Sequence, residues 1–308
     1  MPSAVDHPGA TIEFTKMHGL GNDYVYVDCF QQSLDGVDVS ALAVKMSDRH
    51  RGIGADGLIL IRPPATDSNA DVTMEMYNAD GSRGEMCGNG IRCVAKYALE
   101  HGLVSHDGGE TTDLRIMTDR GVLTLRASLR DGRVDQIRVD MGPPLLKPAE
   151  IGVRERGERC VSSELPANCR SLLGTDRYRM TCVSMGNPHA VLFVDSLGEI
   201  DLAQLGPVME RDAVFSDRIN VHVAAVLSRC EVRMRTWERG TGLTQACGTG
   251  ACAVLVAGVL EDRLDRKATV HLPGGDLEVE WSAGQGGDLG AVFKTGPATE
   301  VFSGHWPV

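Results

Sequence analysis

The chain has 308 residues, of which 42% are hydrophobic, and a formal net charge of -11 at pH 7. This length is enough for about two domains of ordinary size, each with its own hydrophobic core. The acidic balance, with an isoelectric point near 5.3, argues against a general nucleic-acid or anionic-membrane surface, because both require a basic face. We therefore expect a small-molecule partner, with no nucleic acid and no membrane.

Alternating apolar residues predict strands throughout the chain. In the first half they fall at residues 12–17, 24–29, 57–61, 72–77, 114–118, 121–127 and 134–141. In the second half they fall at residues 178–185, 190–194, 219–226, 231–237, 269–272 and 277–281. Helical spacing occurs at residues 40–50, 91–102, 201–212 and 251–264. The second and fourth of these helices are the most apolar, so we expect each to run through the centre of a sheet.

Three prolines in "MGPPLLKPAEIG", residues 141–152, mark the predicted boundary between two domains. The longest apolar run, residues 251–260, is too short to span a bilayer, and residues 1–10 lack the basic and apolar regions of a signal peptide. These features predict a cytoplasmic protein. Nine cysteines, an odd number without a C-x-x-C pair, should mostly be thiols in that reducing compartment.

A motif in the first half recurs in the second half. "CGNG" at Cys87 and "CGTG" at Cys247 are each followed by an apolar helical run. Upstream, at equal spacing, stand Tyr77-Asn78 and Trp237-Glu238. Further upstream, each half has a Gly-Asn pair before a strand. Glycine-rich turns precede helices in many proteins, so one such match could arise by chance, but three in the same order indicate a duplicated architecture with one site element in each half.

A cysteine at a helix start has a chemical advantage. The first turn of a helix presents unpaired N–H groups and the positive end of the helix dipole, which can lower a thiol pKa below its free value of about 8.5. The glycines that follow, Gly88 and Gly248 among them, allow an anion to approach the backbone amides. The sequence therefore predicts a reactive sulfur beside a carboxylate-sized anion site in each half.

Two such thiols suggest a reaction. If the halves face each other across a cleft, Cys87 and Cys247 approach a ligand from opposite sides. Removing a proton from one face of a carbon and returning one to the other requires this arrangement, with one thiolate and one thiol. The predicted reaction class is racemisation or epimerisation next to a carboxylate.

Other cysteine chemistries match the pattern less well. A metal site requires clustered ligands at short spacing, and neither cysteine motif matches a zinc pattern, so we expect no metal. Cys93 and Cys252 lie inside the predicted helices and are expected to be structural. A peptidase-like Cys/His pair remains an alternative, because His189 follows Gly-Asn-Pro in a predicted loop.

The motifs "KMHGLGNDY", "GIGADG", "YNADGSRGEMCGNGIRC", "SMGNPHAV", "INV" and "WERGTGLTQACGTGAC" together resemble diaminopimelate epimerase over nearly the whole chain. The resemblance implies interconversion of LL- and meso-diaminopimelate without pyridoxal phosphate, metal or any other cofactor, in lysine and peptidoglycan synthesis. It implies an α/β fold of the α+β type with two pseudo-symmetric domains, each a mainly antiparallel sheet curled around a helix, and an active site between them. The expected domains are residues 1–143, completed by a C-terminal strand at 294–308, and residues 144–293.

The resemblance also assigns roles to individual residues. Cys87 and Cys247 correspond to the two acid/base thiols, Glu238 to the partner of the reacting amino group, and His189 to a histidine that assists proton transfer. The reacting carboxylate would be held by the backbone amides of Gly88, Asn89, Gly248 and Thr249. The distal amino-acid end would be held by Arg239, whose planar fork suits a carboxylate, together with Asn22, Asn78, Asn187 and Asn220.

Four points stay open at this stage. Gly57 stands where some relatives carry glutamine, which leaves a substrate contact there in doubt. A proline or hydroxyproline racemase is an alternative, but such enzymes tend to have histidine where this chain has Asn89, and their ligand leaves Arg239 without a role. A non-catalytic amino-acid-binding or redox-sensing protein is the other alternative. The sequence leaves the oligomeric state open, with a homodimer as one candidate.

Overall fold

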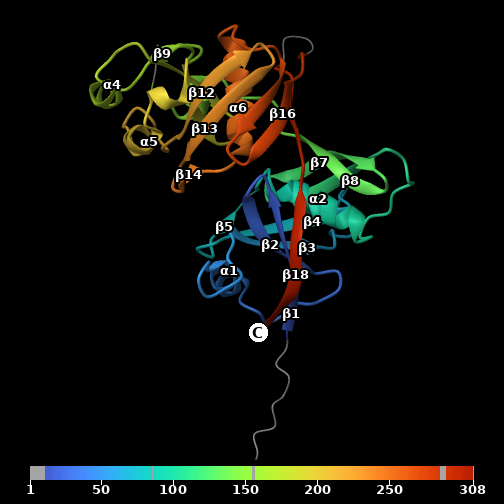
Figure 1. The fold of residues 1–308 in the computed structure, drawn as a ribbon. Coiled ribbons are helices and arrows are strands. Elements are labelled where there is room, and N and C mark those ends of the chain that lie inside the picture. The colour runs from blue at the N-terminus through green and yellow to red at the C-terminus, as the bar shows by residue number, and fades with distance from the viewer. Residues whose placement is uncertain (1–10, 85, 155–156, 285–288, 308) are drawn as a thin grey trace, which may run out of the picture. The chain divides into compact units, whose positions relative to one another are not determined.

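The computed structural model describes residues 11–84, 86–154, 157–284 and 289–307. The chain divides into two compact units, one of residues 1–137 with 297–308 and one of residues 138–296. The N-terminal stretch in which we looked for a signal peptide, residues 1–10, lies outside the described residues. Each unit contains a mixed sheet and a buried helix (Figure 1).

The first unit is a sheet with the antiparallel pair β1–β18 at one side. Its helices are α1 (Val39–Ser47) and α2 (Gly90–Glu100). Its strands are β1 (Thr11–Gly19), β2 (Asn22–Asp28), β3 (Gly57–Arg62), β4 (Val72–Asn78), β5 (Arg83–Gly84), β6 (Thr111–Thr118), β7 (Gly121–Arg130) and β18 (Thr299–Pro307), with β8 (Arg133–Asp140) crossing into the second unit. From β1 the pairings run β1–β2 antiparallel, β2–β3 parallel, β3–β4 antiparallel, β4–β6 parallel and β6–β7 antiparallel, with β5 antiparallel to β4.

The second unit repeats this order of pairing. Its helices are α3 (Pro148–Ile151), α4 (Ala167–Leu173), η1 (Leu197–Glu199), α5 (Leu202–Glu210) and α6 (Gly248–Leu260). Its strands are β9 (Ser163–Glu164), β10 (Arg179–Ser184), β11 (Pro188–Val194), β12 (Asn220–Ser228), β13 (Glu231–Glu238), β14 (Gly242–Thr244), β15 (Lys267–Leu272), β16 (Gly275–Trp281) and β17 (Val292–Gly296). The pairings run β10–β11 antiparallel, β11–β12 parallel, β12–β13 antiparallel, β13–β15 parallel and β15–β16 antiparallel, with β14 antiparallel to β13.

The registers of the two sheets match residue for residue. The pair Leu58↔Tyr77 in the first unit corresponds to Val221↔Trp237 in the second. The parallel pairs Val25↔Leu58 and Ala190↔Val221 extend the match to β2 and β11. Counting back along these strands makes Asn22 the counterpart of Asn187. The duplication that the motifs indicate is therefore present in the fold.

Each sheet is covered on both faces. Helix α2 packs against β1, β2, β4, β6 and β7, and α6 packs against β10, β11, β12, β15, β16 and β17. The other face of the first sheet packs on α1, where Val25, Leu58 and Leu42 share one core. The other face of the second sheet packs on α5, where Val221 and Leu205 share another. Strand residues alternate between the faces, so the neighbours of Leu58 and Val221, Ile59 and His222, point toward the central helices.

The fold class expected from the sequence is confirmed, because both units are mostly strands around one buried apolar helix. In α6, every residue from Gly250 to Gly258 is buried, which explains why its sequence is apolar all round. No helix among the described residues is long and apolar enough to cross a membrane. The domain limits expected from the sequence, at 143/144 and 293/294, stay a prediction.

Candidate active site

Cys87 lies just before α2 in the first unit, half-buried. Its Sγ contacts the Asn22 Oδ1 at 3.2 Å, and the backbone N–H of Gly90 points at the same sulfur at an N···S distance of 3.4 Å. Burial and then the neighbouring Cys87 raise the pKa of the Tyr24 phenol well above its ordinary value. The thiol is thus held between a helix amide and two polar side chains of β2.

Asn22 and Asn89 meet at this sulfur. Asn22 donates from Nδ2 to Asp56 Oδ2 at 2.7 Å and accepts from Asn89 Nδ2 at 3.4 Å. Asp56 is itself paired with Arg49 at 2.8 Å. Two of the asparagines expected from the sequence are therefore brought together at the thiol.

A buried arginine holds the turn between Cys87 and α2. Arg92 is fully buried and donates from Nη1 to the Gly88 carbonyl at 3.2 Å and to Asn89 Oδ1 at 3.0 Å. Its Nε donates to the carbonyl of Pro297 at 3.1 Å. Sequence reasoning missed this residue, although an arginine inside an otherwise apolar helix is a signal, because such a charge is rarely buried without partners.

Asn78 lies at the end of β4, on the strand position that matches Glu238 in β13. It is half-buried, and its Nδ2 donates to Ser82 Oγ at 2.9 Å. Its counterpart Glu238 accepts from Thr244 Oγ1 at 2.6 Å. Gly57 faces Asn78 across the β3–β4 ladder and matches Asn220 in the second unit, so the first unit lacks a side chain where the second has an amide.

Cys247 is the N-cap residue of α6 and is only 3% exposed. Burial and then the negative charge of Glu238 raise the pKa of its thiol well above the ordinary value, although the Gly250 amide and the Thr249 hydroxyl act in the opposite direction. The sequence-based expectation that the helix start would lower this pKa is wrong for Cys247. Desolvation outweighs the helix amides because burial costs a thiolate far more solvation free energy than it costs a neutral thiol.

Arg239 extends from the turn that follows β13. Its Nη1 donates to the carbonyl of Asp217 at 2.7 Å and to the Asp217 carboxylate at 2.6 Å. The Arg239 backbone N–H donates to Asn220 Oδ1 at 2.9 Å, and Asn220 Nδ2 donates to the Pro188 carbonyl at 2.8 Å. Asn220 therefore ties the arginine turn to the start of β11.

Glu210, at the end of α5, holds the turn that follows β13 through two hydrogen bonds. It is 2% exposed and accepts from Trp237 Nε1 at 2.7 Å and from the Gly240 N–H at 3.1 Å. Arg218 lies 3.5 Å from the same carboxylate. No motif pointed to Glu210, since its partners come from distant parts of the chain.

His189 lies in β11, fully buried. Its Nε2 is 2.9 Å from Asn187 Oδ1, and its Nδ1 is 2.9 Å from His222 Nε2. Burial, His222 and the charge of Arg239 lower the pKa of His189 well below its ordinary value. His189 is thus neutral near pH 7, with both ring nitrogens hydrogen-bonded. The sequence did not single out His222, although its spacing of two from Asn220 places both on one strand face.

The residue three positions after each cysteine, Gly90 or Gly250, must be small. A Cβ on Gly90 would lie 2.7 Å from Ile59 Cδ1, and a Cβ on Gly250 would lie 2.4 Å from His222 Cε1. These two strand side chains occupy matching register positions. Close packing of a strand residue under the helix start therefore requires the second glycine of each C-G-x-G motif.

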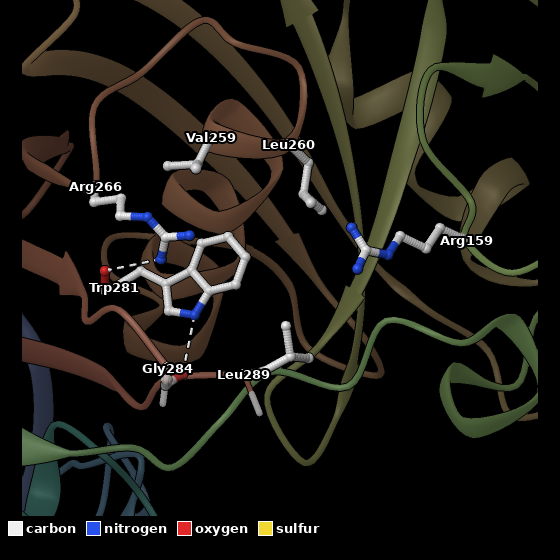
Figure 2. A pocket seen from close by; sticks show the side chains of 8 residues that line it. Arg159, Val259, Leu260, Arg266, Trp281, Gly284 and Leu289 are labelled. Atoms are coloured by element: carbon white, nitrogen blue, oxygen red, sulfur yellow. Dashed lines mark hydrogen bonds between the residues drawn. The ribbon is translucent and has the colours of Figure 1, made fainter. Parts of the chain in front are cut away.

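A cavity of about 310 Å³ lies elsewhere in the second unit (Figure 2). It is lined by Arg159, Val259, Leu260, Arg266, Trp281, Gly284, Leu289 and Gly290. Val259 and Leu260 end α6, so this cavity is separated from Cys247 by the length of that helix, roughly 20 Å. Arg266 is stacked on Trp281, 4.6 Å from the ring centroid, and donates to the Ser282 carbonyl at 3.1 Å.

The remaining chemistry-bearing residues are more dispersed. Cys93 and Cys252 are buried inside α2 and α6, and Cys160 and Cys182 are buried in the second unit, where the Cys182 N–H donates to the Cys160 carbonyl at 2.9 Å. Among the described residues, no three His, Cys, Asp or Glu side chains are grouped so that they could hold a metal ion.

The duplicated fold is shared with known racemases and epimerases. A hydroxyproline epimerase from Agrobacterium vitis aligns with a TM-score of 0.65 at 16% identity, over 96% of this chain and 90% of that one. A phenazine biosynthesis protein of the PhzF family from Bacillus anthracis aligns with a TM-score of 0.70 at 16% identity, over 97% and 100%. At such identities the likeness shows the fold alone.

Sequence comparison gives the family. The diaminopimelate epimerase family model matches residues 14–147 and 181–301. Diaminopimelate epimerase from Pelotomaculum thermopropionicum is 47% identical over 96% of this chain and 99% of that protein. The enzyme of the same name from Agathobacter rectalis is 46% identical over 96% and 99%. The chain belongs to the diaminopimelate epimerase family.

Proposed function

We propose that the protein interconverts LL- and meso-diaminopimelate by a two-base mechanism, without a bound cofactor. The observation that carries this proposal is the duplicated site element: in each unit a cysteine stands at the start of the buried helix, beside the ends of three matching strands. A single thiol would not require a second copy of this arrangement. An inversion at carbon requires a proton carrier on each face.

In the proposed reaction, one sulfur acts as base and the other as acid. The thiolate removes the α-proton from one face, and the electron pair passes into the substrate carboxylate. The other thiol then gives its proton to the opposite face of the carbon, which leaves the charge on the second sulfur. Because the pKa of Cys247 is raised, we assign the proton of the resting enzyme to Cys247 and the first abstraction to Cys87.

The carboxylate that receives the charge needs hydrogen-bond donors already in place. We assign this role to the backbone amides of Gly88 and Asn89 in one unit and of Gly248 and Thr249 in the other. Arg92 supports the first pair, because it donates to the Gly88 carbonyl and to the Asn89 side-chain oxygen and so holds this turn in place. Backbone amides at a helix start can bind the reacting carboxylate without a positively charged side chain.

Glu238 is the proposed partner of the reacting ammonium group. Its carboxylate lies next to Cys247, where its charge raises the pKa of the thiol. A substrate ammonium placed on Glu238 would offset that charge and make the sulfur a stronger acid. Substrate binding would thus prepare the proton donor.

The distal amino-acid end is assigned to Arg239 and to the amides of Asn22, Asn78, Asn187 and Asn220. Arg239 Nη1 donates to the Asp217 carboxylate, whose side chain is 82% exposed. In the proposed complex, a substrate carboxylate would replace Asp217 on this guanidinium. His189 is neutral and buried, so we propose that it holds Asn187 in position.

The proposal also covers the cellular compartment and the oligomeric state of the protein. The thiol-based site favours a reducing compartment, so we place the enzyme in the cytoplasm. A homodimer is the proposed assembly, with the two cysteines of each site supplied by one chain.

Replacing Arg239 by lysine tests the substrate assignment. Lysine keeps the charge but loses the planar fork, so one of two parallel hydrogen bonds to the distal carboxylate is lost. Because a charge-assisted hydrogen bond contributes roughly 1.5 to 3 kcal/mol, KM for LL-diaminopimelate should rise about ten- to a hundredfold while kcat changes little. Activity on L-proline in the unmodified protein, or loss of kcat without a change in KM, would reject the assignment.

A further inference from the structure

Four polar side chains form a row under the start of α6, three of them buried and Asn187 half-buried. His189, His222 and Thr236 come from the adjacent strands β11, β12 and β13, and Asn187 directly precedes β11. Strands β12 and β13 are seen beside α6 in Figure 1. Asn187 Oδ1 lies 2.9 Å from His189 Nε2, His189 Nδ1 lies 2.9 Å from His222 Nε2, and His222 Nδ1 lies 3.0 Å from Thr236 Oγ1. The two rings are fully buried, and Thr236 is 3% exposed.

The chemistry of the four groups sets the direction of every hydrogen bond. An amide oxygen only accepts, so the Nε2–H of His189 donates to Asn187. In the neutral ring, Nδ1 is then bare and accepts from the Nε2–H of His222. The bare Nδ1 of His222 accepts in turn from the Thr236 hydroxyl. Burial lowers the pKa of His222 to about 3, which keeps this ring neutral as the row requires.

The first unit shows that the fold does not need this row. At the matching register positions it has Asn22, Tyr24, Ile59 and Met76. The asparagine is kept and has a polar ring next to it, because Tyr24 interacts with the Asn22 side chain. The two outer positions, however, are apolar. A sheet of the same topology is therefore built with Ile59 and Met76 where the second unit buries His222 and Thr236.

The chemical difference between Tyr24 and His189 explains why only the second unit has the polar residues His222 and Thr236. A phenol has one hydroxyl, whereas a neutral imidazole carries its proton on either nitrogen. If His189 held its proton on Nδ1, its bare Nε2 would require Asn187 to turn its NH₂ inward. The Asn187 oxygen would then face the ligand, and a carboxylate there would meet an acceptor in place of a donor.

We propose that His222, held by Thr236, is a positioning residue that fixes His189 in the Nε2–H form, so that Asn187 keeps its NH₂ group directed toward the substrate. This inference rests on the proposed function, which assigns Asn187 to the distal end of diaminopimelate. The row touches no reacting atom. Its effect is on affinity, through the orientation of one amide.

The test uses two variants of the full-length protein. His222→Ile installs the residue of the first unit, and Thr236→Val removes only a hydroxyl at nearly constant volume. In each, KM for LL-diaminopimelate should rise about three- to tenfold, as for one neutral hydrogen bond lost, with kcat within about twofold. Thr236→Ser, which restores the hydroxyl, should return KM toward the starting value. His271→Gln is the control, because His271 is bonded to Asp276 outside the row.

The tautomer is read directly from two-bond ¹⁵N–¹H spectra of protein labelled at histidine. His189 should show a protonated Nε2 and a bare Nδ1 in the unmodified protein, and both tautomers in His222→Ile and Thr236→Val. An unchanged tautomer with unchanged KM in both variants would overturn the proposal, as would a fall in kcat at constant KM, which would indicate an action through Cys247. Failure of the unmodified protein to epimerise diaminopimelate would instead reject the proposed function, whatever the spectra show.

Discussion

At the scale of single residues, the two cysteines occupy matching sequence motifs but different surroundings. Cys87 is half-buried and contacts an amide oxygen, whereas Cys247 is buried beside a carboxylate. The helix start is common to both, and at Cys247 it is outweighed by desolvation and by Glu238. A duplicated motif therefore places its two thiols in different surroundings, and in those of Cys247 burial and Glu238 raise the thiol pKa.

Replacing Glu238 by glutamine should lower the pKa of Cys247. The carboxylate disfavours a neighbouring thiolate, so without its charge the thiolate forms at lower pH. Alkylation of Cys247 by iodoacetamide, followed by peptide mass spectrometry from pH 7 to 10, should then be faster at each pH in Glu238→Gln. Glu231→Gln is the control, because Glu231 is exposed at the other end of the same strand. An equal or slower alkylation rate in Glu238→Gln would contradict the stated cause.

Much of the candidate site could be predicted from the sequence at this scale. The Gly-Asn pairs and the C-G-x-G motifs bring Asn22 to Cys87, and the turn after Trp237 brings Glu238 to Cys247. Arg92 and Glu210 could not be found in this way. Their partners, Pro297 and Trp237, are supplied by tertiary contacts between distant segments, and no local spacing encodes them.

At the scale of elements, each central helix begins directly above a strand side chain. In the first unit that side chain is Ile59, and in the second it is His222. An isoleucine end can rotate away, but a ring bonded at both nitrogens cannot move without breaking its hydrogen bonds. The start of α6 is therefore less tolerant of a residue larger than Gly250 than the start of α2 is of a residue larger than Gly90.

Gly250→Ala should destabilise α6 more than Gly90→Ala destabilises α2. Overpacking against His222 costs about 1 to 3 kcal/mol, which exceeds the helix-propensity gain of roughly 1 kcal/mol for replacing glycine by alanine. Against Ile59 the two effects should nearly cancel. Peptide-resolved hydrogen exchange of α2 and α6 measures both changes, with Gly198→Ala as the control, because a Cβ there contacts nothing closer than 4.0 Å. Equal protection loss in α2 and α6 would contradict the role of the His222 ring.

Alternating apolar residues did not predict several strands, for two physical reasons. Strands β5, β9 and β14 have two or three residues, too few for an alternating pattern. Strand β18 is longer but was expected only from the family resemblance, because its apolar residues Val301 and Phe302 are 54% and 48% exposed. Its pairing with β1 is antiparallel along its length, so backbone hydrogen bonds hold it more than a buried face does.

At the scale of the whole molecule, the chain ends in the unit where it begins. Strand β18 pairs with β1 from Thr11↔Pro307 to His18↔Thr299, and the two lie side by side in Figure 1. His101 on the C-terminal side of α2 adds a contact to Glu300 at 3.0 Å. The two units therefore share a topology, but the first is built from two separate segments of the chain and the second from one continuous segment.

Ending the chain after Gly296 should therefore destabilise the first unit selectively. The truncation leaves the edge of β1 unpaired and removes the Pro297 carbonyl that Arg92 uses. Hydrogen exchange in β2 and α2 should rise at least about tenfold, while β12 and α6 serve as the internal control. Equal loss of protection in both units would show that β18 supports the whole molecule rather than one sheet.

The central claim is that one thiol in each unit carries a proton during an inversion at carbon. Incubation of the purified protein with LL-diaminopimelate in deuterated water tests this claim most directly. The account predicts meso-diaminopimelate with deuterium at the inverted α-carbon, and no product from either Cys87→Ala or Cys247→Ala, although both variants remain folded. Undiminished meso product from either single variant would contradict the two-base mechanism.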